Sequence, residues 1–251
     1  MSQKLLQDRV AIVTGGGSGI GQEICTTFAR EGAITAVLDI NEDAANLVAE
    51  SVGGLALTID VSDPRSCADA VQLVRKSLGP PKILVCSAAY FAKRVPLADV
   101  ADDVWKRCLT VNIGGHFNMS KQCIPHMIAA GGGSIVHISS IMAKVANYGQ
   151  AAYCTTKGAL TMLSKGIALD YAKDGIRSNT LMPGGIATQG MAELYGGDMA
   201  RAEAEWGAIM HPMGRLGQVG EIANAALFLA SDGSSFITGI DLPVEGGYSI
   251  R

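Results

Sequence analysis

Short apolar runs alternate with helical stretches along the whole sequence. Seven runs are expected to be strands, at residues 9–14, 34–39, 55–60, 82–87, 133–139, 176–182 and 237–244. Continuous apolar runs such as 9–14 are typical of strands buried on both faces of a sheet. Regular alternation of strand and helix favours parallel strands joined by helical crossovers. The sequence therefore predicts an α/β fold, a doubly wound parallel sheet of about seven strands with helices on both faces.

The helices between these strands carry start signals. One is expected from Gly19 to about Arg30 and one begins near Asn41, while Asp63 and Pro64 have the N-cap and first-turn arrangement of another. Three more are expected at residues 102–129, from about 151 to 173, and at 219–230.

The chain is expected to form one domain over residues 1–251, a length that α/β folds reach without a division. No linker, repeat or low-complexity run interrupts the pattern. The irregular segment 184–215, rich in Gly and Met, is predicted to be a lid over the substrate.

The composition and net charge limit the kinds of partner that the protein is expected to bind. Hydrophobic residues make up 48% of the chain, and the formal net charge of −3 argues against nucleic acid and anionic membranes. The sequence shows no apolar run of membrane-spanning length and no secretory signal, so a cytoplasmic location is expected.

Cysteine and histidine give no metal signature. The six cysteines lack CxxC spacing and are expected to be reduced thiols, and the four histidines are isolated in sequence. No metal site is therefore predicted. These residues are Cys25, Cys67, Cys86, Cys108, Cys123, Cys154, His116, His126, His137 and His211.

A glycine-rich stretch, TGGGSGIG at residues 14–21, lies between the first strand and the first helix. Glycines allow a tight turn close to a pyrophosphate, and the helix N-terminus offers free N–H groups and a positive dipole end. This position predicts a Rossmann-type dinucleotide site. The expected contacts in this glycine loop (14–21) are Gly15, Ser18, Gly19, Ile20 and Gly21.

Acidic residues end the second and third strands. Asp39, followed by Ile40, is placed to accept hydrogen bonds from the adenosine ribose, and its carboxylate would repel a 2′-phosphate, which selects NAD over NADP. The alternative for Asp39 is a helix N-cap, in competition with Asn41. Asp60 and Val61 are expected near the adenine, with turn chemistry as the alternative for Asp60.

Tyr153 and Lys157 are four residues apart in AAYCTTKGAL, residues 151–160. On a helix they lie on one face, where a cation lowers the pKa of a phenol and makes it a usable proton donor and acceptor near neutral pH. A surface lysine beside a core tyrosine is the alternative for an isolated pair.

Together these motifs resemble the short-chain dehydrogenase/reductase family over essentially the whole chain. The resemblance adds the asparagine of VNIGG, the serines that end the fifth strand, PGGIAT at 183–188 and the late glycine pair. It implies a catalytic tetrad of Asn112, Ser140, Tyr153 and Lys157. The catalytic serine of the family lies thirteen residues before the tyrosine, which selects Ser140 over Ser139.

The resemblance also implies roles. Tyr153 exchanges the alcohol proton, Ser140 binds the substrate oxygen, Lys157 holds the nicotinamide ribose, and Asn112 holds a water that relays protons. Ile186 and Thr188 are expected at the carboxamide and the phosphates, and Thr188 also fits the N-cap of a helix beginning near Gln189.

One motif departs from the family. Its usual NNAG after the fourth strand is CSAA here, residues 86–89. Ser87 is expected to keep the backbone contact to the adenosine ribose, while Ala89 narrows the space next to it.

The predicted function is transfer of a hydride between a secondary alcohol (polyol, sugar, diol or cyclic hydroxyl compound) and NAD. One alternative is an NADPH-dependent ketoreductase of the 3-oxoacyl type, against which Asp39 counts. Another is a nucleotide-binding regulator without turnover. By the resemblance the protein is expected to be a homotetramer that pairs the helices at about 102–129 and 151–172. Its expected partner is a small alcohol or ketone substrate, and neither nucleic acid nor a membrane is expected to bind.

Overall fold

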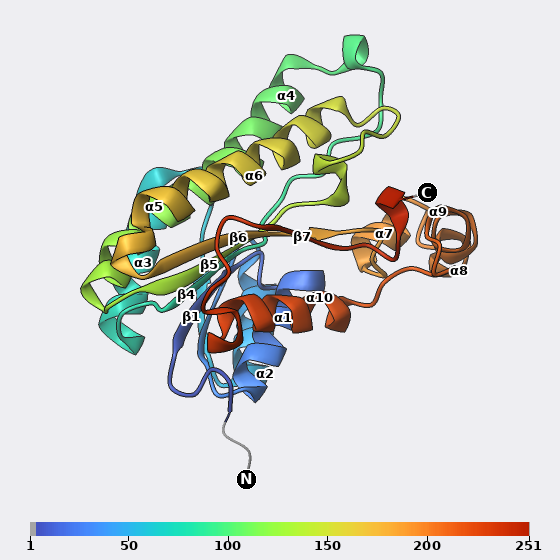
Figure 1. Cartoon of the computed structure of the whole chain (residues 1–251). Coiled ribbons are helices and arrows are strands. Elements are labelled where there is room, and N and C mark those ends of the chain that lie inside the picture. Colours follow the sequence, from blue (N-terminus) through green and yellow to red (C-terminus); the bar gives the residue numbers. More distant parts are fainter. Residues whose placement is uncertain (1–3, 251) are drawn as a thin grey trace.

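Seven parallel strands form one sheet in the order β3-β2-β1-β4-β5-β6-β7 (Figure 1). The computed structural model describes residues 4–250. The strands are β1 (Val10–Thr14), β2 (Ile34–Asp39), β3 (Leu55–Thr58), β4 (Ile83–Cys86), β5 (Gly133–Ile138), β6 (Ile176–Pro183) and β7 (Asp241–Val244). The predicted doubly wound fold is confirmed.

Helices cover both faces of the sheet, as Figure 1 shows. One layer holds α1 (Gly19–Arg30), α2 (Glu42–Val52) and α10 (Val219–Ala230). The other holds α3 (Pro64–Leu78), α4 (Asp102–Leu109), α5 (Gly115–Ala129) and α6 (Ala151–Tyr171). A buried apolar cluster lies under each layer, with Phe28 in the first and Met119 in the second.

The start signals of two helices act as predicted. The Asn41 side chain accepts a hydrogen bond from the Ala44 N–H and caps α2, and Asp63 accepts one from the Arg65 N–H ahead of Pro64. Local side-chain chemistry therefore fixes these two boundaries.

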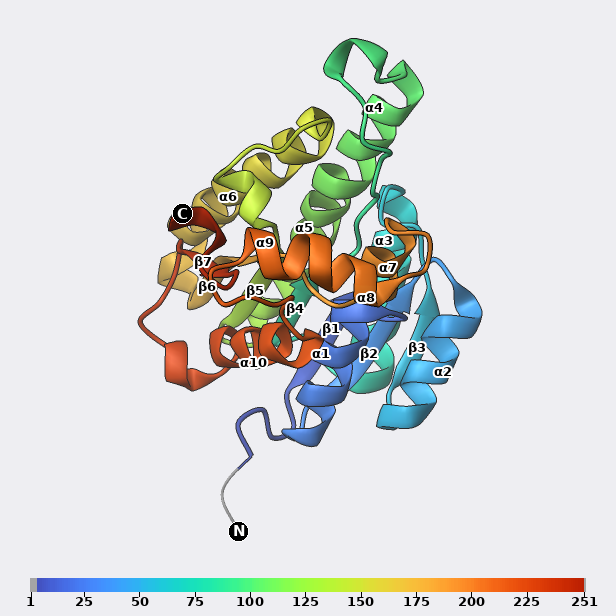
Figure 2. The ribbon, with the colours of Figure 1, turned by 90° about the vertical axis from the view of Figure 1, so that its right-hand side faces the viewer.

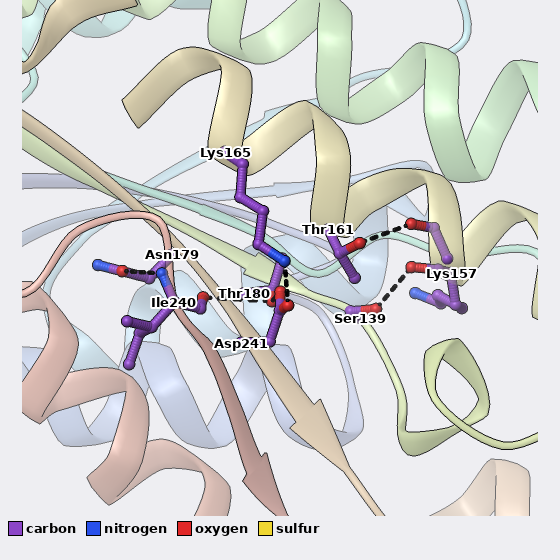
Figure 3. A network of polar contacts seen from close by, with 9 residues as sticks. Ser139, Lys157, Thr161, Lys165, Asn179, Thr180, Ile240 and Asp241 are labelled. Atoms are coloured by element: carbon purple, nitrogen blue, oxygen red, sulfur yellow. Dashed lines mark hydrogen bonds and ion pairs between the residues drawn. The ribbon is translucent and has the colours of Figure 1, made fainter. Parts of the chain in front are cut away.

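Two strands differ from their predicted range by two or more residues at one end. β3 ends at Thr58, because the Asp60 N–H donates to Ser66 Oγ and not to a strand. β7 begins at Asp241, after a loop in which the Gly239 N–H binds the Ser178 carbonyl. Asp241 is tied to α6 and β6, since its carboxylate accepts from Lys165 Nζ and Thr180 Oγ1, both at 2.5 Å (Figure 3).

The long helix expected at 102–129 is divided. A π-helical turn, Thr110–Gly114, joins α4 to α5 and contains Asn112. Such turns widen a helix by one residue and are frequent at functional sites.

The carboxyl ends of the parallel strands lie at one edge of the sheet. The chain runs outward from β1 to β3 on one side, and then outward from β4 to β7 on the other, so the strand order reverses between β1 and β4. Ligands bind α/β sheets in the crevice at this point. Segment 184–215 lies at the same edge, where β6 and β7 end (Figures 1 and 2). It contains α7 (Gln189–Glu193), α8 (Met199–Ala202), a π turn (Glu203–Gly207) and α9 (Ala208–Met210).

No helix within residues 4–250 combines the length and the apolar character that a membrane span requires.

Candidate active site

Lys157 is buried beside Tyr153 on α6. The lysine is 2% exposed, its Nζ donates to the Ile138 carbonyl at 2.8 Å, and Nζ lies 5.6 Å from the centre of the Tyr153 ring. The two residues share a helix face, as their spacing predicts. Burial lowers the pKa of Lys157 to about 7.

The pKa of Tyr153 departs from the prediction. Desolvation raises the pKa of the phenol above its usual value, and a hydrogen bond with Ser140 acts in the opposite direction. The expected lowering by Lys157 is therefore wrong for the protein alone. The physical reason is that burial disfavours charge on both groups, so each tends toward its neutral form.

The two serines that end β5 have different partners. Ser140 contacts the Tyr153 phenol, and its Oγ also accepts from the Met142 N–H at 3.1 Å. Ser139 Oγ donates to the main-chain carbonyl of Lys157 at 2.9 Å and so anchors α6 (Figure 3). The structure thus places Ser140, and not Ser139, against the tyrosine.

Asn112 uses its side chain to hold the loop after β4. Its Oδ1 accepts from the Tyr90 N–H at 2.6 Å, and its Nδ2 donates to the Tyr90 carbonyl and to Thr156 Oγ1 at 3.0 and 3.2 Å. Thr156, fully buried between Tyr153 and Lys157, was not anticipated. Its only sequence signal was its place inside the YxxxK motif, because its partner lies 44 residues away.

The glycine loop lies against the segment that follows β4. Gly15 has φ of +63°, and a Cβ there would lie 2.8 Å from the main-chain N and Cα of Ala88. Thr14 Oγ1 accepts from the Ser87 and Ala88 N–H groups at 3.1 and 3.3 Å. The CSAA segment therefore packs on the loop through its main chain, and Ser87 directly follows the carboxyl end of β4.

The start of α1 fits an anionic group. A Cβ at Gly21 would lie 2.0 Å from the Gly15 carbonyl, so only glycine permits the turn. Ser18 is the N-cap but makes no side-chain capping bond. The first N–H groups of α1, at Gly19, Ile20 and Gly21, thus have no side-chain cap, which suits the pyrophosphate of a dinucleotide.

Asp39 lies beside the glycine loop. Its carboxylate accepts from the Gly17 and Asn41 N–H groups at 2.9 and 3.0 Å. Asn41 is the cap of α2, so the helix-cap alternative for Asp39 is wrong. Ile40 is exposed next to it.

Asp60 and Val61 follow β3. Asp60 is exposed and accepts from the Ser62 N–H and Oγ at 2.8 and 2.7 Å, which is the turn chemistry given as its alternative. Val61 is buried against α5, since a Cβ at Gly115 would lie 2.6 Å from Val61 Cγ2.

Thr188 combines the two positions expected of it. Its Oγ1 accepts from the Met191 N–H and caps α7, and its methyl group would lie 3.6 Å from a Cβ at Gly19. The side chain therefore faces the start of α1. Ile186 is buried and forms an isolated parallel bridge with Gly217.

Three histidines that are isolated in sequence have defined partners in space. The Nδ1 atoms of His116 and His137 lie 3.0 Å apart. One potential ligand atom from each of these histidines and one from Cys86 all lie within 4.8 Å of one another. His211 Nε2 accepts from the Gly185 N–H at 3.0 Å and so joins the chain after α9 to the PGG turn. Long-range packing therefore gives spatial partners to histidines that are isolated in sequence, and the sequence alone does not reveal them.

Comparisons with known proteins give consistent results. Residues 15–249 match the family described as enoyl-(acyl carrier protein) reductase. The chain is 37% identical over 250 residues to 2,5-dichloro-2,5-cyclohexadiene-1,4-diol dehydrogenase of Sphingobium indicum, with 98% of both chains covered. It is 35% identical over 251 residues to D-threitol dehydrogenase of Mycolicibacterium smegmatis, with 98% of this chain and 95% of the relative covered.

A solved structure agrees. The ligand-free aldohexose dehydrogenase of Thermoplasma acidophilum superposes with a TM-score of 0.90 and 35% identity, covering 100% of this chain and 97% of that one. The family match, the relatives and the sheet order concur: the chain belongs to the short-chain dehydrogenase/reductase family.

Proposed function

We propose that the protein is an NAD-dependent oxidoreductase that moves a hydride between a secondary alcohol and the nicotinamide, with Tyr153 as acid and base. The observation that carries this proposal is the contact of Tyr153 with Ser140 beside the buried Lys157, at the strand edge that also holds the glycine loop. When bound, NAD supplies the hydride acceptor and a positive charge that favours the phenolate.

The chain's own residues carry the proton. Tyr153 Oη takes the hydroxyl proton of the alcohol during oxidation and returns it during reduction. Ser140 donates a hydrogen bond to the substrate oxygen as negative charge develops there. Lys157, when protonated, offsets the desolvation that raises the pKa of the phenol, and it also holds the nicotinamide ribose.

Asn112 contributes by position. Its three hydrogen bonds to Tyr90 and Thr156 fix the loop after β4 to α6 and leave the π turn beside Lys157. A water held at this turn connects Lys157 to solvent in the proposed relay.

Two regions hold the cofactor. The glycine loop and the N-terminus of α1 take the pyrophosphate, with Thr188 facing the same helix start. Asp39 takes the adenosine ribose and excludes a 2′-phosphate, which makes NAD the preferred cofactor over NADP. Val61 and Ser87 lie along the adenosine side.

The whole chain is one catalytic domain in this proposal, and segment 184–215 is the substrate lid. A third apolar cluster joins this segment to the region of Tyr153, with Met142, Trp206 and Tyr248 buried in it. Relatives that act on a cyclohexadiene diol and on a tetritol support a diol, a polyol or a cyclic hydroxyl compound as substrate.

The test is a screen that follows NADH or NADPH absorbance. The protein is given NAD⁺ or NADP⁺ with cyclic diols, linear polyols, sugars and simple secondary alcohols. We expect turnover with NAD⁺ and one substrate class. Tyr153→Phe should lose activity by at least about 100-fold, the scale of general acid–base catalysis. Tyr148→Phe is the matched control, because Tyr148 is 96% exposed.

Three outcomes discriminate between the functions. Activity with NADP⁺ alone would overturn the role of Asp39. Equal activity in Tyr153→Phe would overturn the role of the tyrosine. Tight NADH binding with no turnover across the panel would favour the nucleotide-binding regulator.

A further inference from the structure

A cluster of three metal-binding side chains lies inside the protein. Cys86 ends β4, His116 is on the first turn of α5 and His137 is on β5. Their exposures are 0%, 1% and 0%, and one potential ligand atom of each lies within 4.8 Å of the other two. None of the three has a role in the proposed reaction.

The donors suit a soft transition metal. The set is one sulfur and two imidazole nitrogens, without a carboxylate, and such sets favour copper or zinc over magnesium or calcium. Each neutral imidazole has one unprotonated nitrogen, which is the atom that binds a metal ion.

The ring nitrogens of the two histidines make few hydrogen bonds. The two rings share one hydrogen bond between their Nδ1 atoms. Nε2 of His137 is buried and has no hydrogen-bond partner among the residues that the structure describes, whereas His116 also forms a hydrogen bond with the main chain of Ala88. Buried polar groups without partners are rare in native proteins, and an ion is one of the causes to be considered.

We propose that Cys86, His116 and His137 bind a single Cu⁺ ion, one sulfur and two nitrogens in a three-coordinate site. On binding, the S–H bond of Cys86 breaks, an S–Cu bond forms, and the proton leaves to the buffer. The hydrogen bond between the two rings opens, the unprotonated nitrogen of each imidazole forms a dative N–Cu bond, and copper keeps its oxidation state. The site requires no further ligand from the protein or solvent.

Charge favours Cu⁺ over Zn²⁺ here. A thiolate and Cu⁺ sum to zero, whereas a thiolate and Zn²⁺ leave a buried positive charge. A net charge inside the protein is costly, and a neutral unit avoids that cost.

The cluster adjoins the candidate active site through the main chain. Cys86 precedes Ser87, which contacts Thr14, and His137 precedes Ile138, whose carbonyl accepts from Lys157. An ion held by these three residues would join β4, β5 and α5 directly beneath the crevice. We therefore expect bound copper to raise the thermal midpoint of unfolding.

The test uses the full chain, produced anaerobically in copper-supplemented and zinc-supplemented media because the cluster is closed to solvent. Metal content is measured by elemental analysis, and Cu⁺ affinity by competition with bicinchoninate after refolding. We expect about one copper per chain, and Cys86→Ser and His137→Asn should each weaken binding by at least about tenfold. Thermal unfolding of each variant checks that it is folded.

Two control variants separate this site from other thiols and imidazoles. Cys123 is a buried cysteine on α5 outside the triad, and His126 lies further along the same helix. Cys123→Ala and His126→Gln should keep the copper. A copper-free wild-type protein, or binding that survives Cys86→Ser and His137→Asn together, would overturn the site. Loading with zinc but not copper would overturn the choice of ion.

Discussion

The Phe91 ring stacks on the Tyr153 ring, with their centres 5.4 Å apart and their planes 28° from parallel. Phe91 is 67% exposed, so an aromatic face lies at the entrance to the proposed acid and base. Aromatic contacts of this kind contribute about 0.5–1.5 kcal/mol. Phe91 therefore bears on which alcohols reach Tyr153.

Phe91→Ala should weaken binding of cyclic substrates more than linear ones. We expect KM for a cyclic diol to rise by about two- to tenfold, with kcat and the KM for a linear polyol nearly unchanged. Steady-state kinetics on matched cyclic and linear substrates measure this. Phe236→Ala, in the exposed loop after α10 and outside the helices expected to pair between copies, is the control. Equal losses on both substrates would contradict a role in selectivity.

Replacing Asp39 is expected to change the preference between NAD⁺ and NADP⁺. The double variant Asp39→Ser/Ile40→Arg removes the carboxylate and adds a guanidinium that can bind the 2′-phosphate of NADP⁺. The ratio of kcat/KM for NAD⁺ to that for NADP⁺ should fall by at least about 100-fold, on the order of 3 kcal/mol. Asp60→Asn removes the exposed acid after β3 and should leave the ratio unchanged. A constant ratio in the double variant would show that Asp39 does not read the ribose.

The lowered pKa of Lys157 predicts that the free energy of unfolding depends on pH. Its pKa is about 7 in the folded protein and 10.5 in a free side chain, so between these values the unfolded chain binds the extra proton. The free energy of unfolding contributed by this group thus rises with pH above 7, by at most about 1.4 kcal/mol per pH unit, and is constant below.

Urea denaturation of wild type and Lys157→Met from pH 6 to pH 9 tests this. The variant should be the more stable of the two at pH 6, and the difference should shrink as pH rises through 7 and beyond. Comparing the two proteins cancels the titration of the buried cysteines. Parallel curves would mean that Lys157 keeps an ordinary pKa.

The exposed apolar side chains of α6 predict that copies of the chain associate with one another through this helix. Met162 and Leu169 are two turns apart on one face and are 67% and 82% exposed. Leu169→Glu should convert the expected homotetramer to smaller species in light scattering, with its circular dichroism unchanged. Leu47→Glu on α2, in the opposite helix layer, is the control. A wild-type monomer would refute the proposal.

Local chemistry made much of the fold predictable. Asn41 and the Asp63–Pro64 pair act on groups within three residues, so their effect could be read without the rest of the chain. The apolar runs likewise gave six of the strands to within two residues, because burial on both faces leaves little choice of side chain. Only β7 began four residues later, where loop hydrogen bonds replace the ladder.

The parts that could not be predicted depend on distant contacts. His116 and His137 are 21 residues apart and meet only because α5 packs on β5. The raised pKa of Tyr153 follows from burial, which the YxxxK spacing does not report. The anchoring of Asn112 to Tyr90 and Thr156 likewise joins three separate elements.

The position of β1 between β2 and β4 sets an order of assembly during synthesis. Ala11 pairs with Thr35 on one side and with Ile83 on the other, and Gly15 rests against Ala88. At about 5–20 residues per second, the ribosome takes several seconds to supply that second neighbour. Asp241, which binds Lys165 of α6, is among the last residues of the chain to be made. A nascent chain can thus bring the glycine loop against the segment after β4 well before the helix that carries Tyr153 and Lys157 is secured.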